Sequence, residues 1–254
     1  MFKRISILIT LLLLSILAVA QNVTHYTYKI NKEYPHSRAS YTEGLFFNDG
    51  KLYESIGQYG ESAFLQVNLE DGSAIKSTPF ESKYFIEGSC ILNGYLYILT
   101  WKHYTCFVYN PETMVKMADF RNPREGWGMT TDGKSLIISD GSSNIYYHDP
   151  LTFMEQKKIK VKLNGKSVNN LNELEYIDGK IWANIYLTDF IVIIDPETGN
   201  VIGKIDCTGI LSSSLRKRDT DVLNGIAYDP CKKKIYVTGK YWPKMYQISI
   251  VPEK

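Results

Sequence analysis

The chain has 254 residues, and its 29 Lys and Arg nearly balance its 27 Asp and Glu, giving a net charge of +2. This balance gives no electrostatic reason to expect nucleic acid or an anionic membrane as a partner. Aromatic residues make up 13% of the chain, and this proportion favours many strands around a buried core.

The first twenty residues have the pattern of a secretory signal peptide. Lys3 and Arg4 precede an apolar run over 5–20, which ends in the small-residue pattern Ala18-Val19-Ala20. The run is shorter than the roughly 20 residues that a membrane-spanning helix needs. We therefore predict cleavage after Ala20 and export to the periplasm or out of the cell. The mature chain 21–254 should then have no membrane attachment.

Four cysteines and four scattered histidines follow, with no Cys-x-x-Cys pair among them. This spacing predicts no zinc site. Export permits disulfides, and the pairing of Cys90, Cys106, Cys207 and Cys231 stays open, as do free buried thiols. Cys90 and Cys106 are expected on strands separated by a third strand, too far apart to bridge.

One pattern recurs five times: a polar pair opens an apolar strand, a tight turn follows, and a second apolar strand returns. Turns such as Asn93-Gly94 and Asp178-Gly179 are strong hairpin signals, and further strands follow each copy. Units of about 40–50 residues with four strands each predict an all-β, five-bladed β-propeller forming one domain over 21–254. A β-sandwich predicts no such recurring motif. The copies begin at Glu43-Gly44, Glu87-Gly88, Glu125-Gly126, Asn172-Glu173 and Asn224-Gly225.

In a propeller the first strand of each blade lies nearest the axis, so the residues that open the copies should form a ring at one mouth of the channel. Burying carboxylates there costs several kcal/mol unless they are paired or hydrogen-bonded. A structural ring, or one that holds a metal or water, is one interpretation. Trp101 and Trp127 beside the carboxylates favour the other, a partly apolar pocket for a small molecule.

These segments resemble the plant- and bacterial-type glutaminyl-peptide cyclotransferases, five-bladed propellers that convert N-terminal glutamine to pyroglutamate. Matching segments occur in every repeat between about 41 and 247. They include Tyr41-Thr42-Glu43-Gly44-Leu45, Glu125-Gly126-Trp127-Gly128, Leu171-Asn172-Glu173-Leu174 and Thr238-Gly239-Lys240-Tyr241-Trp242.

The resemblance implies that Glu87 is the essential acid. It places the other pocket residues at Tyr41, Glu43, Trp101, Glu125, Trp127, Asn172, Tyr186 and Lys240. The chain departs from the plant pattern at Tyr41, Glu43 and Tyr186, where Phe, Gln and Trp are usual. The extra charge of Glu43 is expected to favour the cationic amine of a peptide N-terminus.

The implied reaction is intramolecular and needs no protein nucleophile. Glu87 would move the proton, and Asn172, Lys240 and an indole N–H would donate to the oxygen of the tetrahedral intermediate. The other six residues would bind the substrate, a peptide or protein with N-terminal glutamine. We expect a monomer that requires no cofactor, although the acidic ring leaves open a structural calcium ion in the channel.

Two alternatives belong to other functional classes. A calcium-dependent, lactonase-like propeller hydrolase would use the axial carboxylates as cation ligands. A non-catalytic propeller would bind proteins through an exposed face and would not need Glu87. Removing metal ions with a chelator should abolish the activity of the calcium-dependent hydrolase but not that of a cyclotransferase. Substitution of Glu87 should leave the binding propeller functional but should inactivate a cyclotransferase.

Overall fold

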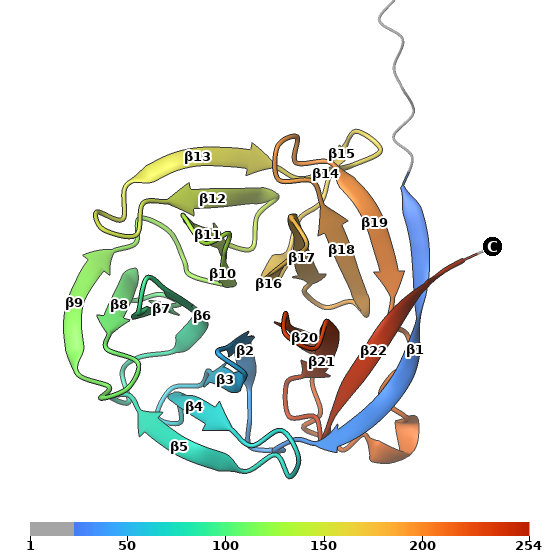
Figure 1. The fold of residues 1–254 in the computed structure, drawn as a ribbon, viewed down its shortest axis with the longest axis horizontal. Coiled ribbons are helices and arrows are strands. Elements are labelled where there is room, and N and C mark those ends of the chain that lie inside the picture. Colours follow the sequence, from blue (N-terminus) through green and yellow to red (C-terminus); the bar gives the residue numbers. More distant parts are fainter. Residues whose placement is uncertain (1–22, 254) are drawn as a thin grey trace, which may run out of the picture.

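The computed structural model describes residues 23–253, which form sheets arranged around a central axis (Figure 1). The predicted signal peptide, 1–20, lies outside this range. No helix within the described range is long and apolar enough to cross a membrane. The innermost strands are β2 (Thr42–Asn48), β6 (Ile86–Leu92), β10 (Met129–Thr131), β16 (Leu171–Ile177) and β20 (Leu223–Asp229).

Three sheets contain four antiparallel strands each, in chain order. The positive φ angles of Asn93 (53°) and Gly94 (78°) show the tight turn that the sequence predicts between β6 and β7. The first sheet continues from β2 through β3 (Lys51–Ile56), β4 (Ala63–Val67) and β5 (Ala74–Pro79). The second continues from β6 through β7 (Tyr95–Thr100), β8 (Thr105–Tyr109) and β9 (Lys116–Arg121). The third continues from β10 through β11 (Leu136–Ser139), β12 (Asn144–His148) and β13 (Glu155–Lys160).

An eight-stranded sheet closes the ring, and its middle strand is the N-terminal β1 (Thr24–Pro35). β1 pairs antiparallel with β22 from Tyr26 to Pro35 and parallel with β19 at Thr24. The first and last strands of the fold are thus hydrogen-bonded to each other, and the all-β propeller prediction is confirmed. The order is β16, β17 (Lys180–Ile185), β18 (Phe190–Ile194), β19 (Val201–Asp206), β1, β22 (Lys244–Pro252), β21 (Lys234–Gly239) and β20. The smaller elements are β14 (Lys162–Leu163), β15 (Lys166–Ser167) and the 3₁₀ turn η1 (Ser213–Leu215).

The core lies between adjacent sheets. Leu99 on β7 and Leu136 on β11 pack in one cluster with Cys90 and Cys106. Cys90 lies on β6 and Cys106 on β8, with β7 between them, as predicted. All four cysteines are free thiols, and burial raises the pKa of the Cys90 thiol well above its usual value.

The backbone groups that face the axis need hydrogen-bond partners, because each innermost strand pairs with a neighbouring strand on only one side. Two buried carboxyls on β16 accept hydrogen bonds from the open sides of other inner strands. Glu173 accepts from the N–H groups of Leu45 (3.2 Å) and Ile226 (2.9 Å). Glu175 accepts from the N–H of Tyr228 at 2.8 Å, and burial raises its pKa to about 8. These carboxyls satisfy backbone donors that would otherwise be buried without partners.

Close approach of the inner strands explains Gly88, which follows the opening residue of the second repeat, and Gly128, which directly precedes β10. A Cβ on Gly88 would lie 2.4 Å from the backbone nitrogen of Met129, and a Cβ on Gly128 would lie 2.1 Å from the carbonyl oxygen of Asn172. Backbone atoms cannot move aside as a flexible side chain can, so larger residues at these positions would separate the strands that carry the site.

A buried ion pair joins the closing sheet to the first sheet. His36 Nε2 lies 3.1 Å from Glu54 Oε1, and both side chains are at most 2% exposed. Ser40 and Thr42 donate hydroxyl hydrogen bonds to the same carboxylate, and His36 Nδ1 contacts the carbonyl oxygen of Trp242. Burial lowers the pKa of His36, but the Glu54 carboxylate outweighs this effect and the net pKa is raised. The pair therefore stabilises the fold most when His36 is charged.

We predict that Glu54→Gln destabilises the protein by about 3–5 kcal/mol, the usual cost of removing one partner of a buried ion pair. The raised pKa means that the contribution of His36 is complete below its ordinary pKa and is lost as pH rises through the folded value. Thermal unfolding of wild type and variant across pH should show a difference that shrinks at high pH.

The matched control is Glu70→Gln, which breaks the exposed Lys32–Glu70 pair and should cost less than about 1 kcal/mol. An equal loss of stability in both variants would contradict a special role for the buried pair.

Candidate active site

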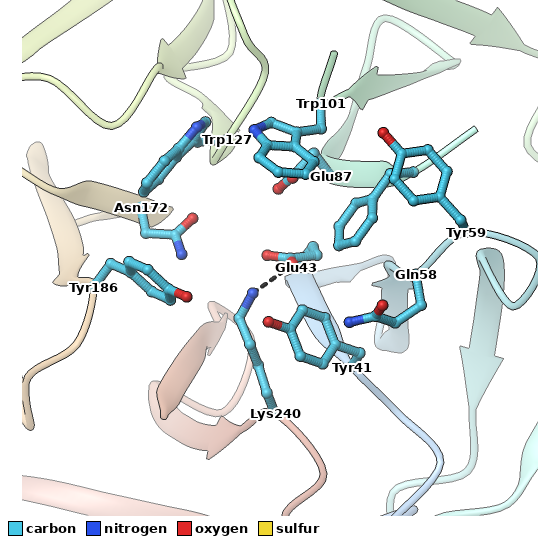
Figure 2. Close-up of a pocket in the computed structure, with 11 residues that line it drawn as sticks. Tyr41, Glu43, Gln58, Tyr59, Glu87, Trp101, Trp127, Asn172, Tyr186 and Lys240 are labelled. Carbon is cyan, nitrogen blue, oxygen red and sulfur yellow. Dashed lines mark hydrogen bonds and ion pairs between the residues drawn. The ribbon is translucent and has the colours of Figure 1, made fainter. Parts of the chain in front are cut away.

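A cavity of about 360 Å³ opens where the inner strands begin (Figure 2). Every predicted site residue except Glu125 lines it. Gln58, Tyr59 and Phe85 also line it, and sequence reasoning missed them. Phe85 could have been found, because it lies two positions before Glu87. Gln58 has a φ of 103°, a strained angle visible only in the structure and of a kind that clusters at functional sites. The full lining is Tyr41, Glu43, Gln58, Tyr59, Phe85, Glu87, Trp101, Trp127, Asn172, Tyr186 and Lys240.

The floor of the cavity holds a buried ion pair between Lys240 and Glu43, each side chain 3% exposed. Lys240 Nζ also lies over the ring of Tyr41, 4.1 Å from its centroid. Asn224 Nδ2 approaches the second oxygen of Glu43 at 3.4 Å. Lys240 balances the charge of Glu43, so the negative charge expected to favour a cationic amine is already paired with a cation.

Glu87 lies beside this pair and is 6% exposed. Burial is the largest effect on its carboxyl and raises its pKa well above the usual value; the nearby charge of Glu43 adds to the rise, and Lys240 opposes it. A carboxyl shifted in this direction can hold a proton near neutral pH and exchange it with a substrate.

Serine hydroxyls fix the backbone of two functional residues from behind. Ser55 Oγ, near the end of β3, donates to the carbonyl oxygen of Glu87 at 2.7 Å. Ser139 Oγ, at the end of β11, donates to the carbonyl oxygen of Asn172, also at 2.7 Å. The same contact occurs in two different sheets, so the repeat itself positions these side chains.

Trp101 and Trp127 form the aromatic wall, and Glu125 lies behind them. The Glu125 carboxylate accepts both indole N–H groups, at 2.8 Å from Trp101 and 3.5 Å from Trp127. Both N–H groups are thereby engaged, so the expectation that an indole donates to the substrate is not met. Glu125 itself precedes β10 rather than opening it, and its carboxylate accepts from the two indoles instead of lining the cavity. Trp127 packs edge-on against Tyr186, with ring centroids 5.6 Å apart.

Asn172 brings to the cavity a buried polar atom that lacks a partner within the described part of the chain. Its side chain is buried, and its Oδ1 has no hydrogen-bond partner among residues 23–253. Its amide faces the same space as Glu87 and Lys240 in Figure 2. Because buried polar atoms normally have partners, this amide is suited to bind a polar ligand in the cavity.

The sequence matches the model of the glutamine cyclotransferase family over residues 5–250. The chain belongs to this family. It is 39% identical to the glutaminyl-peptide cyclotransferase of Arabidopsis thaliana over 222 aligned residues. The alignment covers 86% of this chain and 69% of that protein.

Solved structures agree. The glutaminyl cyclase of Myxococcus xanthus superposes with a TM-score of 0.85 and 31% identity, covering 91% of this chain and 100% of that one. The WD40 propeller domain of Doa1 gives a TM-score of 0.51 at 10% identity, over 81% of this chain and 62% of that one. The second likeness concerns the fold alone.

The hydrogen bonds of Glu125 indicate a testable role for this residue in orienting Trp101 and Trp127. We predict that Glu125→Ala raises KM several-fold, since both indoles lose the acceptor that orients them, whereas Glu125→Gln keeps one oxygen acceptor and has a smaller effect. Steady-state kinetics with a Gln-peptide and the indole fluorescence of both variants measure this. Equal KM values for the two variants and wild type would show that the wall holds without Glu125.

Proposed function

We propose that this cavity closes N-terminal glutamine of peptides and proteins to pyroglutamate, with release of ammonia. The observation that carries the proposal is one buried carboxyl with a raised pKa, Glu87, beside an unsatisfied amide, Asn172, within an aromatic cavity. The family to which the chain belongs is named for this reaction.

In this reaction the α-amine nitrogen bonds to the carboxamide carbon of its own side chain, and the bond from that carbon to the amide nitrogen breaks. Glu87 moves a proton from the attacking nitrogen to the leaving nitrogen, so that ammonia departs and no proton is gained or lost overall. Such proton transfer contributes roughly 10²–10⁴-fold to the rate of an enzyme.

Folding the glutamine side chain back onto its amine is the other requirement. The faces of Trp101, Trp127 and Tyr186 would pack against the glutamine methylenes and exclude water. Holding the side chain in this folded-back conformation removes conformational entropy from the barrier. Asn172 Nδ2 and the Lys240 ammonium would donate to the oxygen that becomes negative in the tetrahedral intermediate. Asn172 Oδ1, which lacks a partner, would accept from the attacking amine.

We also propose export by the segment 1–20, on its charge and apolar pattern, and a monomeric mature enzyme. The mature protein would therefore act on chains in the periplasm or outside the cell. An intact-mass measurement of the exported protein tests cleavage after Ala20, and analytical ultracentrifugation tests the monomer.

The first functional prediction is that Glu87→Gln keeps the fold but lowers kcat by about 10²-fold or more, since glutamine cannot exchange a proton. Ammonia release from Gln-Gln measures the rate, and product peptides should be 17 Da lighter by the mass of one ammonia. Circular dichroism controls for folding. Near-wild-type turnover in the folded variant would remove Glu87 from the proton-transfer role.

A further prediction is that chelation of metal ions leaves activity unchanged. The carboxylates that could bind a cation already have other partners, because Lys240 pairs with Glu43 and Glu125 accepts two indole N–H groups. No cluster of three His, Cys, Asp or Glu suited to a metal occurs over residues 23–253. The assay is ammonia release before and after dialysis against EDTA. Activity lost in EDTA and restored by calcium would instead indicate that a structural ion supports the site.

A further inference from the structure

Three ionisable side chains lie together on the cavity floor. Glu43 follows the first residue of β2, Glu87 follows the first residue of β6, and Lys240 comes directly after β21. None is more than 6% exposed. Lys240 pairs with one oxygen of Glu43, and the Glu87 carboxyl lies beside Glu43, close enough for the two carboxyls to influence each other's ionisation (Figure 2).

Two neighbouring buried carboxyls cannot both ionise without strong repulsion between their charges. The juxtaposition of Glu43 and Glu87 therefore favours one proton on the pair. The Lys240 ammonium touches Glu43, so the negative charge is most stable there and the proton belongs on Glu87. The three groups then carry no net charge, the state that burial favours.

We propose that Glu43 and Glu87 share a single proton and that Glu43 is the positioning residue that keeps this proton on Glu87. The proposal rests on the function proposed above. It concerns this chain in particular, because glutamine is the usual residue of the plant pattern at Glu43 and glutamine cannot carry the charge.

The shared proton determines how the reaction starts. Glu87 meets the free amine of the substrate as an acid, and it gives its proton to the amide nitrogen as the carbon–nitrogen bond breaks. The attacking nitrogen, now bonded to the same carbon, returns a proton to Glu87, and neutral ammonia leaves. The pair ends with one proton, as it began, and turnover must fall when pH rises enough to ionise Glu87.

Other charged groups around the two carboxyls either favour or disfavour the ionisation of Glu87. Lys240 is the cation, and it favours ionisation of Glu87. Glu125 disfavours that ionisation, and Asp221 acts on Glu43 rather than directly on Glu87. Below the floor, burial raises the pKa of the Glu173 carboxyl well above its usual value, and two backbone N–H groups oppose that rise. The titratable groups facing the pair are Lys240, Glu125, Asp221, Glu173, Tyr41 and Tyr186.

The test is the pH dependence of kcat for ammonia release. In Glu43→Gln the neighbouring charge is lost and Lys240 turns to Glu87, so the high-pH limb should move to lower pH by about one unit or more. In Lys240→Met the favourable cation is lost, and the same limb should move to higher pH. These opposite shifts should appear even if both variants also turn over more slowly.

Asp221→Asn is the matched control, since it removes one negative charge close to the cavity without touching the Glu87 carboxyl. Its high-pH limb should move much less than that of Glu43→Gln. An unchanged limb in Glu43→Gln, a shift of the low-pH limb instead, or an equal shift in Asp221→Asn would overturn the proposal.

A second measurement does not depend on turnover. In protein labelled with ¹³Cδ-glutamate, the resonance absent from Glu87→Gln should have the chemical shift of a protonated carboxyl at neutral pH in wild type, and of a carboxylate in Glu43→Gln. A carboxylate shift in wild type would overturn the shared proton. The proposed function fails separately, if folded wild type releases no ammonia from Gln-peptides.

Discussion

The open sides of the innermost strands are the constraint on which the rest of the structure depends. Each of these strands pairs on one side only, so its other N–H and C=O groups face a narrow axis that five strands share. Glu173 and Glu175 satisfy several of these donors from one strand, β16. Both carboxyls are buried, and the backbone donors that they accept from offset part of the cost of that burial.

The same constraint explains why the functional end of the axis can perform proton transfer. At this end the polar residues are held from behind, by Ser55 on the Glu87 carbonyl and by Ser139 on the Asn172 carbonyl. Their side chains therefore face the cavity without needing each other for support. Burial then raises the pKa of Glu87, while the Lys240–Glu43 pair keeps the local charge low. A rigid scaffold and a small net charge allow Glu43, Glu87 and Lys240 to share one buried site.

The sequence carries the fold through local signals and misses what depends on distant partners. Hairpin turns and the glycine after four of the five opening residues are local, so the repeats and most of the lining could be predicted. The strand β1 was missed because it is an outer strand with many exposed polar residues, and its pairing partners lie more than 170 residues away. Motif spacing and the family resemblance both predict Glu125 in the site, yet β10 begins only at Met129. The contact between Lys240 and Glu43, 197 residues apart, has no local signature.

The residue at position 43 shows how one neighbour can change the chemistry of a fixed catalytic group. A glutamine there would leave the Lys240 ammonium without a carboxylate partner, and Glu87 would be the nearest group able to neutralise it. Glu87 would then be ionised and would enter the reaction as a base. With glutamate at position 43, the ammonium is already satisfied, and Glu87 keeps its proton. The catalytic side chain, its backbone support and the aromatic wall need not change between the two cases. What changes is which of two buried carboxyls carries the charge, and that choice depends on the position of a single cation.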